Sequence, residues 1–131
     1  MQPRFTQVED WRRAEALLQP ALIRLVDNLR QLLETSSWQA RYEASESPYP
    51  GQILCLCRGS QSLRVNLWQF CFQICCLDYP LTLEDGEEET RDVVIDPALL
   101  DADGAVDWLA LDQKTRKVLG DFFDGLELAG A

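Results

Sequence analysis

The stretch that decides the fold is residues 51–77, GQILCLCRGSQSLRVNLWQFCFQICCL. Its first part, Ile53 to Cys57, is apolar at every position, which is typical of a central strand covered on both faces. Gly59-Ser60-Gln61 then turns the chain, and Leu63 and Val65 mark the next strand. The first part of the stretch therefore predicts a β-hairpin.

The second part of the stretch, Leu67 to Leu77, is almost wholly apolar, so its period does not separate strand from helix. As a helix, it would be capped by Asn66, and Asn66, Gln69 and Gln73 would form one narrow polar stripe. We favour a mostly buried helix, with a strand as the alternative. In either form the segment belongs to the core.

A strand is also predicted before the hairpin. Residues 38–45 alternate with period two, which indicates a strand with one solvent-facing side. The apolar side consists of Trp38, Ala40, Tyr42 and Ala44. Pro48-Tyr49-Pro50-Gly51 is a strong turn signal, so the three strands form an antiparallel meander.

The N-terminal region predicts a long helix. Thr6-Gln7-Val8-Glu9 fits a capping box at its start. Apolar residues recur at steps of three and four from Trp11 to Leu32, which predicts one amphipathic helix ending near Glu34. Pro20 removes one backbone hydrogen bond, so we expect a kink there, with two abutting helices as the alternative.

The C-terminal region carries turns, a strand and a second helix. Residues 84–89 form a short acidic run, expected to be a loop, and Arg91 to Ile95 is β-branched enough for a further strand. An amphipathic helix follows, for which we predict a cap at Asp112 and an end near Gly125.

These elements predict an α+β fold, in which a small antiparallel sheet of about four strands packs against a long N-terminal helix and a C-terminal helix. A length of 131 residues is that of one domain, so residues 1–131 are expected to form a single unit. No apolar run is long enough to cross a bilayer, and the first residues lack the apolar segment of a signal peptide. A cytoplasmic protein is expected.

The net charge of −10 is unevenly distributed. Up to Leu77 there are seven acidic and eight basic residues, whereas from Asp78 onward there are fifteen and four. This acidic field repels phosphate backbones and anionic lipids, so we expect neither nucleic acid nor a membrane as a partner. A protein with a basic surface is the partner it would attract, although such charge also serves solubility alone.

The sequence contains no histidine, which excludes Ser-His and Cys-His nucleophile activation and every zinc site that uses histidine. The five cysteines lie inside apolar runs rather than in C-x-x-C pairs around a turn, so core packing is favoured over a metal or redox role. They are Cys55, Cys57, Cys71, Cys75 and Cys76. Glycine-rich phosphate-binding motifs are also missing, so we expect no enzyme and no cofactor.

Two weaker signals lie near the start of the C-terminal helix. Trp108 sits between Asp107 and Asp112 among turn residues, where a half-exposed aromatic side chain could contact a partner. A short acidic series offers weak candidates for a metal site, but its Asp101-Ala102-Asp103-Gly104 core lacks the first acid and the last glutamate of a calcium-binding loop. The series is Asp96, Asp101, Asp103 and Asp107.

The function expected from these features is a non-catalytic protein–protein interaction module, such as an adaptor, an assembly factor or a regulator of a larger complex. A homodimer is one form that such a module takes. The alternative is a divalent-ion-binding protein that uses the acidic segment after Asp96 or, less favoured, a cysteine metal site.

Overall fold

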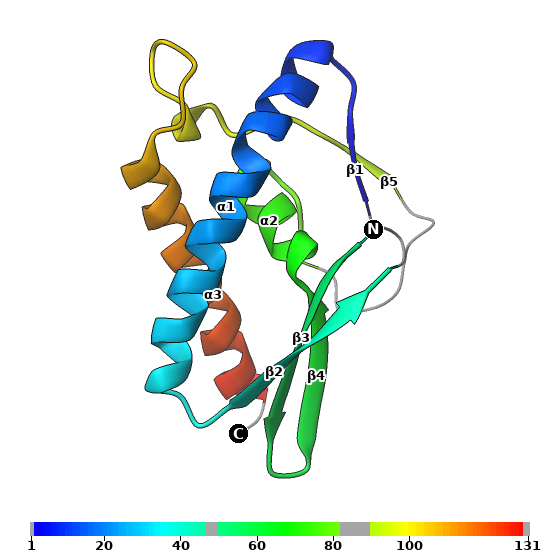
Figure 1. Ribbon diagram of the computed structural model, residues 1–131, viewed down its shortest axis with the longest axis vertical. Coiled ribbons are helices and arrows are strands. Elements are labelled where there is room, and N and C mark those ends of the chain that lie inside the picture. The colour runs from blue at the N-terminus through cyan, green and yellow to red at the C-terminus, as the bar shows by residue number, and fades with distance from the viewer. Residues whose placement is uncertain (1, 47–49, 82–89, 130–131) are drawn as a thin grey trace.

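The computed structural model describes residues 2–46, 50–81 and 90–129, and its two long helices lie side by side (Figure 1). The third helix lies between this pair and a three-stranded sheet, and it contacts both (Figure 1). The elements in chain order are β1 (Gln2–Phe5), α1 (Val8–Glu34), β2 (Gln39–Ser45), β3 (Gly51–Arg58), β4 (Gln61–Asn66), α2 (Leu67–Cys75), β5 (Thr90–Val93), the 3₁₀ turn η1 (Pro97–Leu99) and α3 (Trp108–Ala129). The α+β class is confirmed.

The meander predicted around the hairpin is confirmed. Strands β2, β3 and β4 form an antiparallel sheet in that order, with β3 in the centre. A two-residue turn joins β3 to β4, and its Gly59 has a φ of +61°, in the left-handed region that favours glycine. Leu54 and Leu56 on β3 are fully buried. The apolar centre of the hairpin is therefore the inner face of this sheet.

The further strand predicted at Arg91 to Ile95 exists as β5 but does not join the sheet. It pairs in parallel with β1, from Gln2 opposite Thr90 to Phe5 opposite Val93. The expected sheet of about four strands is thus a three-stranded sheet plus a separate two-stranded one. Because β1 is only four residues long and largely polar, its sequence gave no strand signal.

Helix α1 is one helix that continues through Pro20 and ends at Glu34, as expected. The predicted capping box at Thr6 to Glu9 is wrong. Gln7 occupies the N-cap position in an extended conformation, without a side-chain cap, and the N–H of Trp11 bonds to the Gln7 carbonyl at 3.2 Å. Because the backbone is still extended at Gln7, the helix begins at Val8, and Thr6 lies one residue before the N-cap position.

The helical interpretation of Leu67 to Leu77 is confirmed for α2. The Asn66 side chain accepts a hydrogen bond from the N–H of Trp68 at 2.9 Å, as a helix cap does. The helix can be apolar on nearly all sides because α1, α3 and β3 surround it. Phe70 is fully buried and meets the ring of Phe122 edge-on, with centroids 5.0 Å apart.

Helix α3 begins earlier and ends later than predicted. Asp107, not Asp112, caps it, since the Asp107 carboxylate accepts from the N–H of Ala110 at 3.1 Å. The helix also continues past Gly125 to Ala129. An isolated helical glycine costs about 1 kcal/mol, and apolar packing of Leu126 against the core offsets it.

The core is a continuous cluster of buried apolar side chains drawn from the three α-helices, the meander, β5 and the chain between them. Within the described ranges, none of the helices combines the length and apolarity that a bilayer crossing demands. The acidic run at 84–89 falls outside the described residues, as do Pro48 and Tyr49 of the predicted turn.

Candidate functional site

An apolar groove with a volume of about 330 Å³ lies between β1, α1 and α2. We call it the aromatic groove. It is lined by Gln2, Pro3, Phe5, Trp11, Leu18, Trp68 and Phe72.

One wall of the aromatic groove comes from the N-terminal region. Trp11 and Leu18 lie two turns apart on the same face of α1. Phe5 ends β1, and its pairing with Val93 of β5 places it beside α1. The rings of Phe5 and Trp11 meet edge-on with centroids 6.0 Å apart. Strand β1, which is paired with β5, thus supplies part of this wall of the groove.

The other wall comes from α2. The rings of Trp68 and Phe72 are stacked, with centroids 6.4 Å apart. The Trp68 indole donates a hydrogen bond from Nε1 to the carbonyl of Pro50 at 3.1 Å. It lies so close to Gly51 that a Cβ at that residue would be 2.7 Å from Nε1. Glycine at residue 51 is therefore what lets the indole lie across the start of β3.

Part of the apolar surface at and beside the groove faces solvent. The Trp11 side chain is 56% exposed, and Val8, one turn earlier, is 67% exposed. A concave surface of aromatic rings beside exposed apolar side chains is suited to enclosing an aliphatic or aromatic group of a ligand or protein. Sequence reasoning assigned Trp11 to the buried stripe of α1. It missed the groove because β1 gave no signal.

A second hollow, of about 600 Å³, lies between the end of α2, β5 and α3, and it is more polar. Here Lys114 Nζ donates to the Asp96 carboxylate at 2.7 Å and to the Cys76 carbonyl at 3.4 Å. Burial alone raises the pKa of Asp96, but hydrogen bonds from Lys114 and from the N–H of Ala98 outweigh it, and the pKa is lowered. Each charge in this pair is therefore largely neutralised by the other.

The nucleophilic groups of the second hollow are not activated. Burial raises the pKa of Cys76 to about 12 and that of Tyr79 to about 12. A catalytic thiol or phenol needs a shift in the other direction. The Tyr79 hydroxyl donates to the Gln69 side chain at 2.9 Å, which holds it in the wall of the hollow.

The carboxylates of the acidic series have separate structural roles. Asp96 pairs with Lys114 as described, and Asp101 accepts from the N–H groups of Asp103 and Ala105 at 2.9 and 3.0 Å. Asp107 caps α3. Among the described residues, no group of three or more His, Cys, Asp or Glu side chains is placed to hold a metal ion.

The expected interaction residues around Trp108 also separate. Trp108 is 50% exposed and the neighbouring Leu109 is 69% exposed, so these two form a small apolar spot at the start of α3. Asp107 is occupied as the helix cap, and Asp112 turns toward α1. Of the three residues, Trp108 is the one whose side chain remains exposed.

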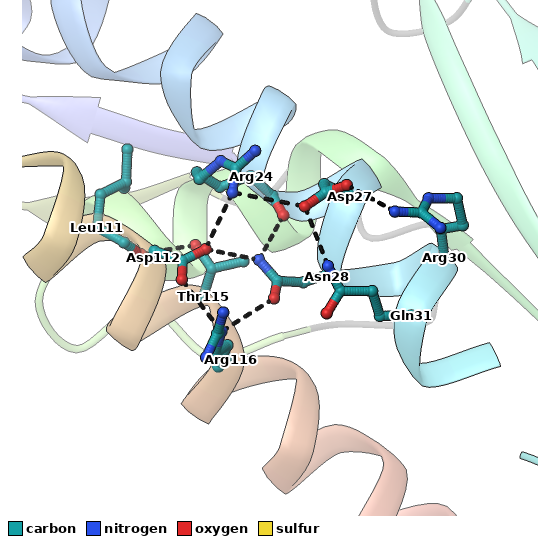
Figure 2. Close-up of polar contacts among 9 residues, drawn as sticks. All are labelled: Arg24, Asp27, Asn28, Arg30, Gln31, Leu111, Asp112, Thr115 and Arg116. Carbon is teal, nitrogen blue, oxygen red and sulfur yellow. Dashed lines mark hydrogen bonds and ion pairs between the residues drawn. The ribbon is translucent and has the colours of Figure 1, made fainter. Parts of the chain in front are cut away.

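Asp112 belongs to a polar network between α1 and α3 (Figure 2). Asn28, only 4% exposed, donates to the Asp112 carboxylate at 2.9 Å and to the Arg24 carbonyl at 2.8 Å. Arg116 reaches back from α3 to the Asn28 side-chain oxygen at 3.3 Å and to Asp112 at 3.0 Å. Hydrogen bonding from Asn28 is the largest effect that lowers the pKa of Asp112. The buried side chains of this network all have partners, so the network joins the two helices rather than offering a vacant site.

Comparison of the chain with protein-family models, with curated proteins and with solved structures finds no match. Function is therefore inferred from the geometry of this chain. The aromatic groove is the candidate site, because it combines the exposed ring of Trp11 with a defined hollow lined by other aromatic rings.

Proposed function

We propose that the protein is a non-catalytic protein–protein interaction module of the cytoplasm, acting as an adaptor, an assembly factor or a regulator of a larger complex. The observation that carries the proposal is the aromatic groove, with its half-exposed Trp11. Aromatic side chains in a concave surface are typical anchors of protein interfaces. All five cysteines are free thiols, which supports a reducing compartment.

The charge of the molecule supports a partner with a basic surface. The net charge is −10, and several acidic side chains of the second half are exposed on the described surface. They include Asp78, Asp101, Asp103, Asp121, Asp124 and Glu127. Such a field speeds the approach of a basic protein, while the groove supplies the short-range apolar contact.

The test compares two exposed tryptophans by affinity capture from native lysate with mass spectrometry. We expect wild-type protein and the Trp108→Ala variant to retain the same partner, and Trp11→Ala to lose it by roughly tenfold or more, as for an interface anchor. Circular dichroism and thermal melts establish that both variants fold. Equal capture by all three proteins would rule out the aromatic groove as the binding site.

A second arm of the same experiment varies salt. Because long-range attraction is screened at high ionic strength, capture should weaken as salt rises from about 0.05 to 0.5 M. If the captured amount does not change with salt, the acidic surface has no part in recognition and the groove alone supports the proposal.

A further inference from the structure

Strand β2 forms an edge of the three-stranded sheet, and among the described residues no strand pairs with its outer side. An edge strand presents unpaired backbone N–H and C=O groups, to which another strand can bond. The side chains of β2 are exposed or half-exposed along its whole length.

The hairpin determines which backbone groups face this edge. Arg58 and Gln61 pair across a two-residue turn, so they form a hydrogen-bonded pair. The register continues without interruption through β3 to β2, where Arg41 lies opposite Cys55. Because hydrogen-bonding direction alternates along a strand, Arg41 and Glu43 bond to β3. The N–H and C=O groups of residues 40, 42 and 44 therefore point outward.

The side chains of the same three residues lie on the inner face of the sheet but remain uncovered. Tyr42 pairs with Leu54 in the register, yet Leu54 is 0% exposed and Tyr42 is 44% exposed. Ala40 and Ala44 are also exposed. The helices thus cover the apolar face at β3 and leave it open at β2.

We propose that β2 pairs in antiparallel fashion with β2 of a second copy of this chain, about a two-fold axis at Tyr42. The two three-stranded sheets would then form one six-stranded sheet. Tyr42 would bond to Tyr42 of the second copy, and Ala40 to its Ala44, through the backbone groups that point outward. The uncovered apolar faces would become adjacent.

The charges on the opposite face of β2 select this register. About Tyr42, Arg41 of each copy lies directly opposite Glu43 of the other, which is a favourable cross-strand pair. A shift that moves the axis to residue 41 sets Arg41 against Arg41, and an axis at residue 43 sets Glu43 against Glu43. Like charges directly opposite are destabilising, so the charge pattern is self-complementary only about Tyr42.

In the single chain, the charged side chains of β2 and β4 already lie together on the same face of the sheet. Glu43 accepts from Arg41 of its own strand and from Arg64 of β4, the latter at 2.8 Å. Arg41 and Arg64 remain 64% and 58% exposed. Arg64 therefore continues to pair with Glu43 when Arg41 turns to the second copy.

The experiment measures molar mass by light scattering of the full chain between about 1 and 100 µM, a range that covers weak dimers. We expect a concentration-dependent dimer for wild type. Arg41→Glu and Glu43→Arg each place like charges in opposition at two symmetric positions, and each should raise the dissociation constant about tenfold or more. The double variant restores opposite charges in reversed order and should dimerise like wild type.

Mixing the two single variants provides the decisive comparison. At residues 41 and 43, the Arg41→Glu variant carries two acids and the Glu43→Arg variant carries two bases. An equimolar mixture should therefore form a heterodimer, although each variant alone is mainly monomeric. The mixture also separates a lost interface from a lost fold, because a misfolded variant would not be rescued. A wild-type monomer throughout the range, or single variants that dimerise as wild type does, would overturn the proposal.

This surface is distinct from the aromatic groove. Trp11→Ala should leave the dimer intact, and Arg41→Glu should leave the groove's own binding to the captured partner intact. Failure of one proposal is therefore distinguishable from failure of the other.

Discussion

The five cysteine thiols differ in their exposure to solvent. Cys55 and Cys57 lie two residues apart on β3 and share its outward face, yet Cys55 is 3% exposed and Cys57 is exposed. Arg41 and Arg64 flank Cys55 in the register, whereas Cys57 lies between Gln39 and Ser62. The longer side chains of Arg41 and Arg64 cover the Cys55 thiol, whereas the shorter neighbours of Cys57 leave its thiol accessible.

The remaining thiols lie in and just after α2, where burial raises the pKa of Cys71 to about 12 and also raises the pKa of Cys75. We predict that the native protein titrates rapidly with one equivalent of a thiol reagent such as DTNB at pH 8, because one thiol is exposed. All five should react after unfolding. The variant Cys57→Ser should lose the rapid phase. A second rapid thiol in that variant would contradict the burial of Cys55 and of the α2 sulfurs.

At the scale of elements, the contact between α1 and α3 combines apolar packing with the polar network of Figure 2. Leu25 and Leu111, which the structure buries fully, pack in the core, while Asn28 and Asp112 bond across the helix pair. Contacts between leucines tolerate a shift of one helix along the other, whereas the side-chain amide of Asn28 bonds to specific partners. We infer that the network fixes the register of the two helices.

The corresponding prediction concerns Asn28→Ala. Removing the amide leaves the half-buried Asp112 without one hydrogen-bond donor and the more exposed Arg116 without one acceptor, so the free energy of unfolding should fall by about 1–3 kcal/mol. The midpoint of urea denaturation measures this change. Gln31→Ala is the matched control, because Gln31 is an exposed amide on the same helix that donates to Asp27 at 3.2 Å. Its effect should lie within about 0.5 kcal/mol. Equal losses in both variants would show that the network has no special role.

At the scale of the whole molecule, stability below about pH 8 should depend on pH only at the acidic end, whereas the raised pKa values of the buried thiols act at higher pH. Histidine is the side chain whose ordinary pKa lies between pH 5 and 8, and the chain has none. The pKa values of Glu43, Asp92, Asp96 and Asp112 are lowered. A lowered carboxylate pKa adds stability above the unfolded value of about 4, and this stability is lost as pH falls through the folded value.

We therefore predict a constant urea midpoint from about pH 5.5 to 8 and a decline below about pH 4. The Asp112→Asn variant should be less stable at neutral pH, and its midpoint should fall less steeply in acid. Urea titrations at half-unit pH intervals test both statements. A decline that begins near pH 6.5 would contradict them.

The local elements that the sequence predicted correctly are those whose signal is contained within a few residues. Three signals each specify their element locally. They are the apolar run at Ile53 to Cys57 with its two-residue turn, the Asn66 cap, and the apolar stripe of the helix that ends at Glu34. The predictions that failed depend on competition between neighbours. Asp107 and Asp112 are equally good caps by type, and packing of α3 against the core extends the helix back past Asp112 to Trp108, which leaves Asp107 as the cap.

The sequence by itself determined the class of fold, the meander, the apolar α2 and the lack of imidazole chemistry, because periodicity, turn residues and composition act over short range. Tertiary structure alone decided the pairing of β1 with β5, hence the aromatic groove, and which face of β2 stays uncovered. These features join residues up to 88 positions apart, as Arg4 and Asp92 are. No local preference encodes such pairing, since its free energy arises only when distant surfaces bury one another.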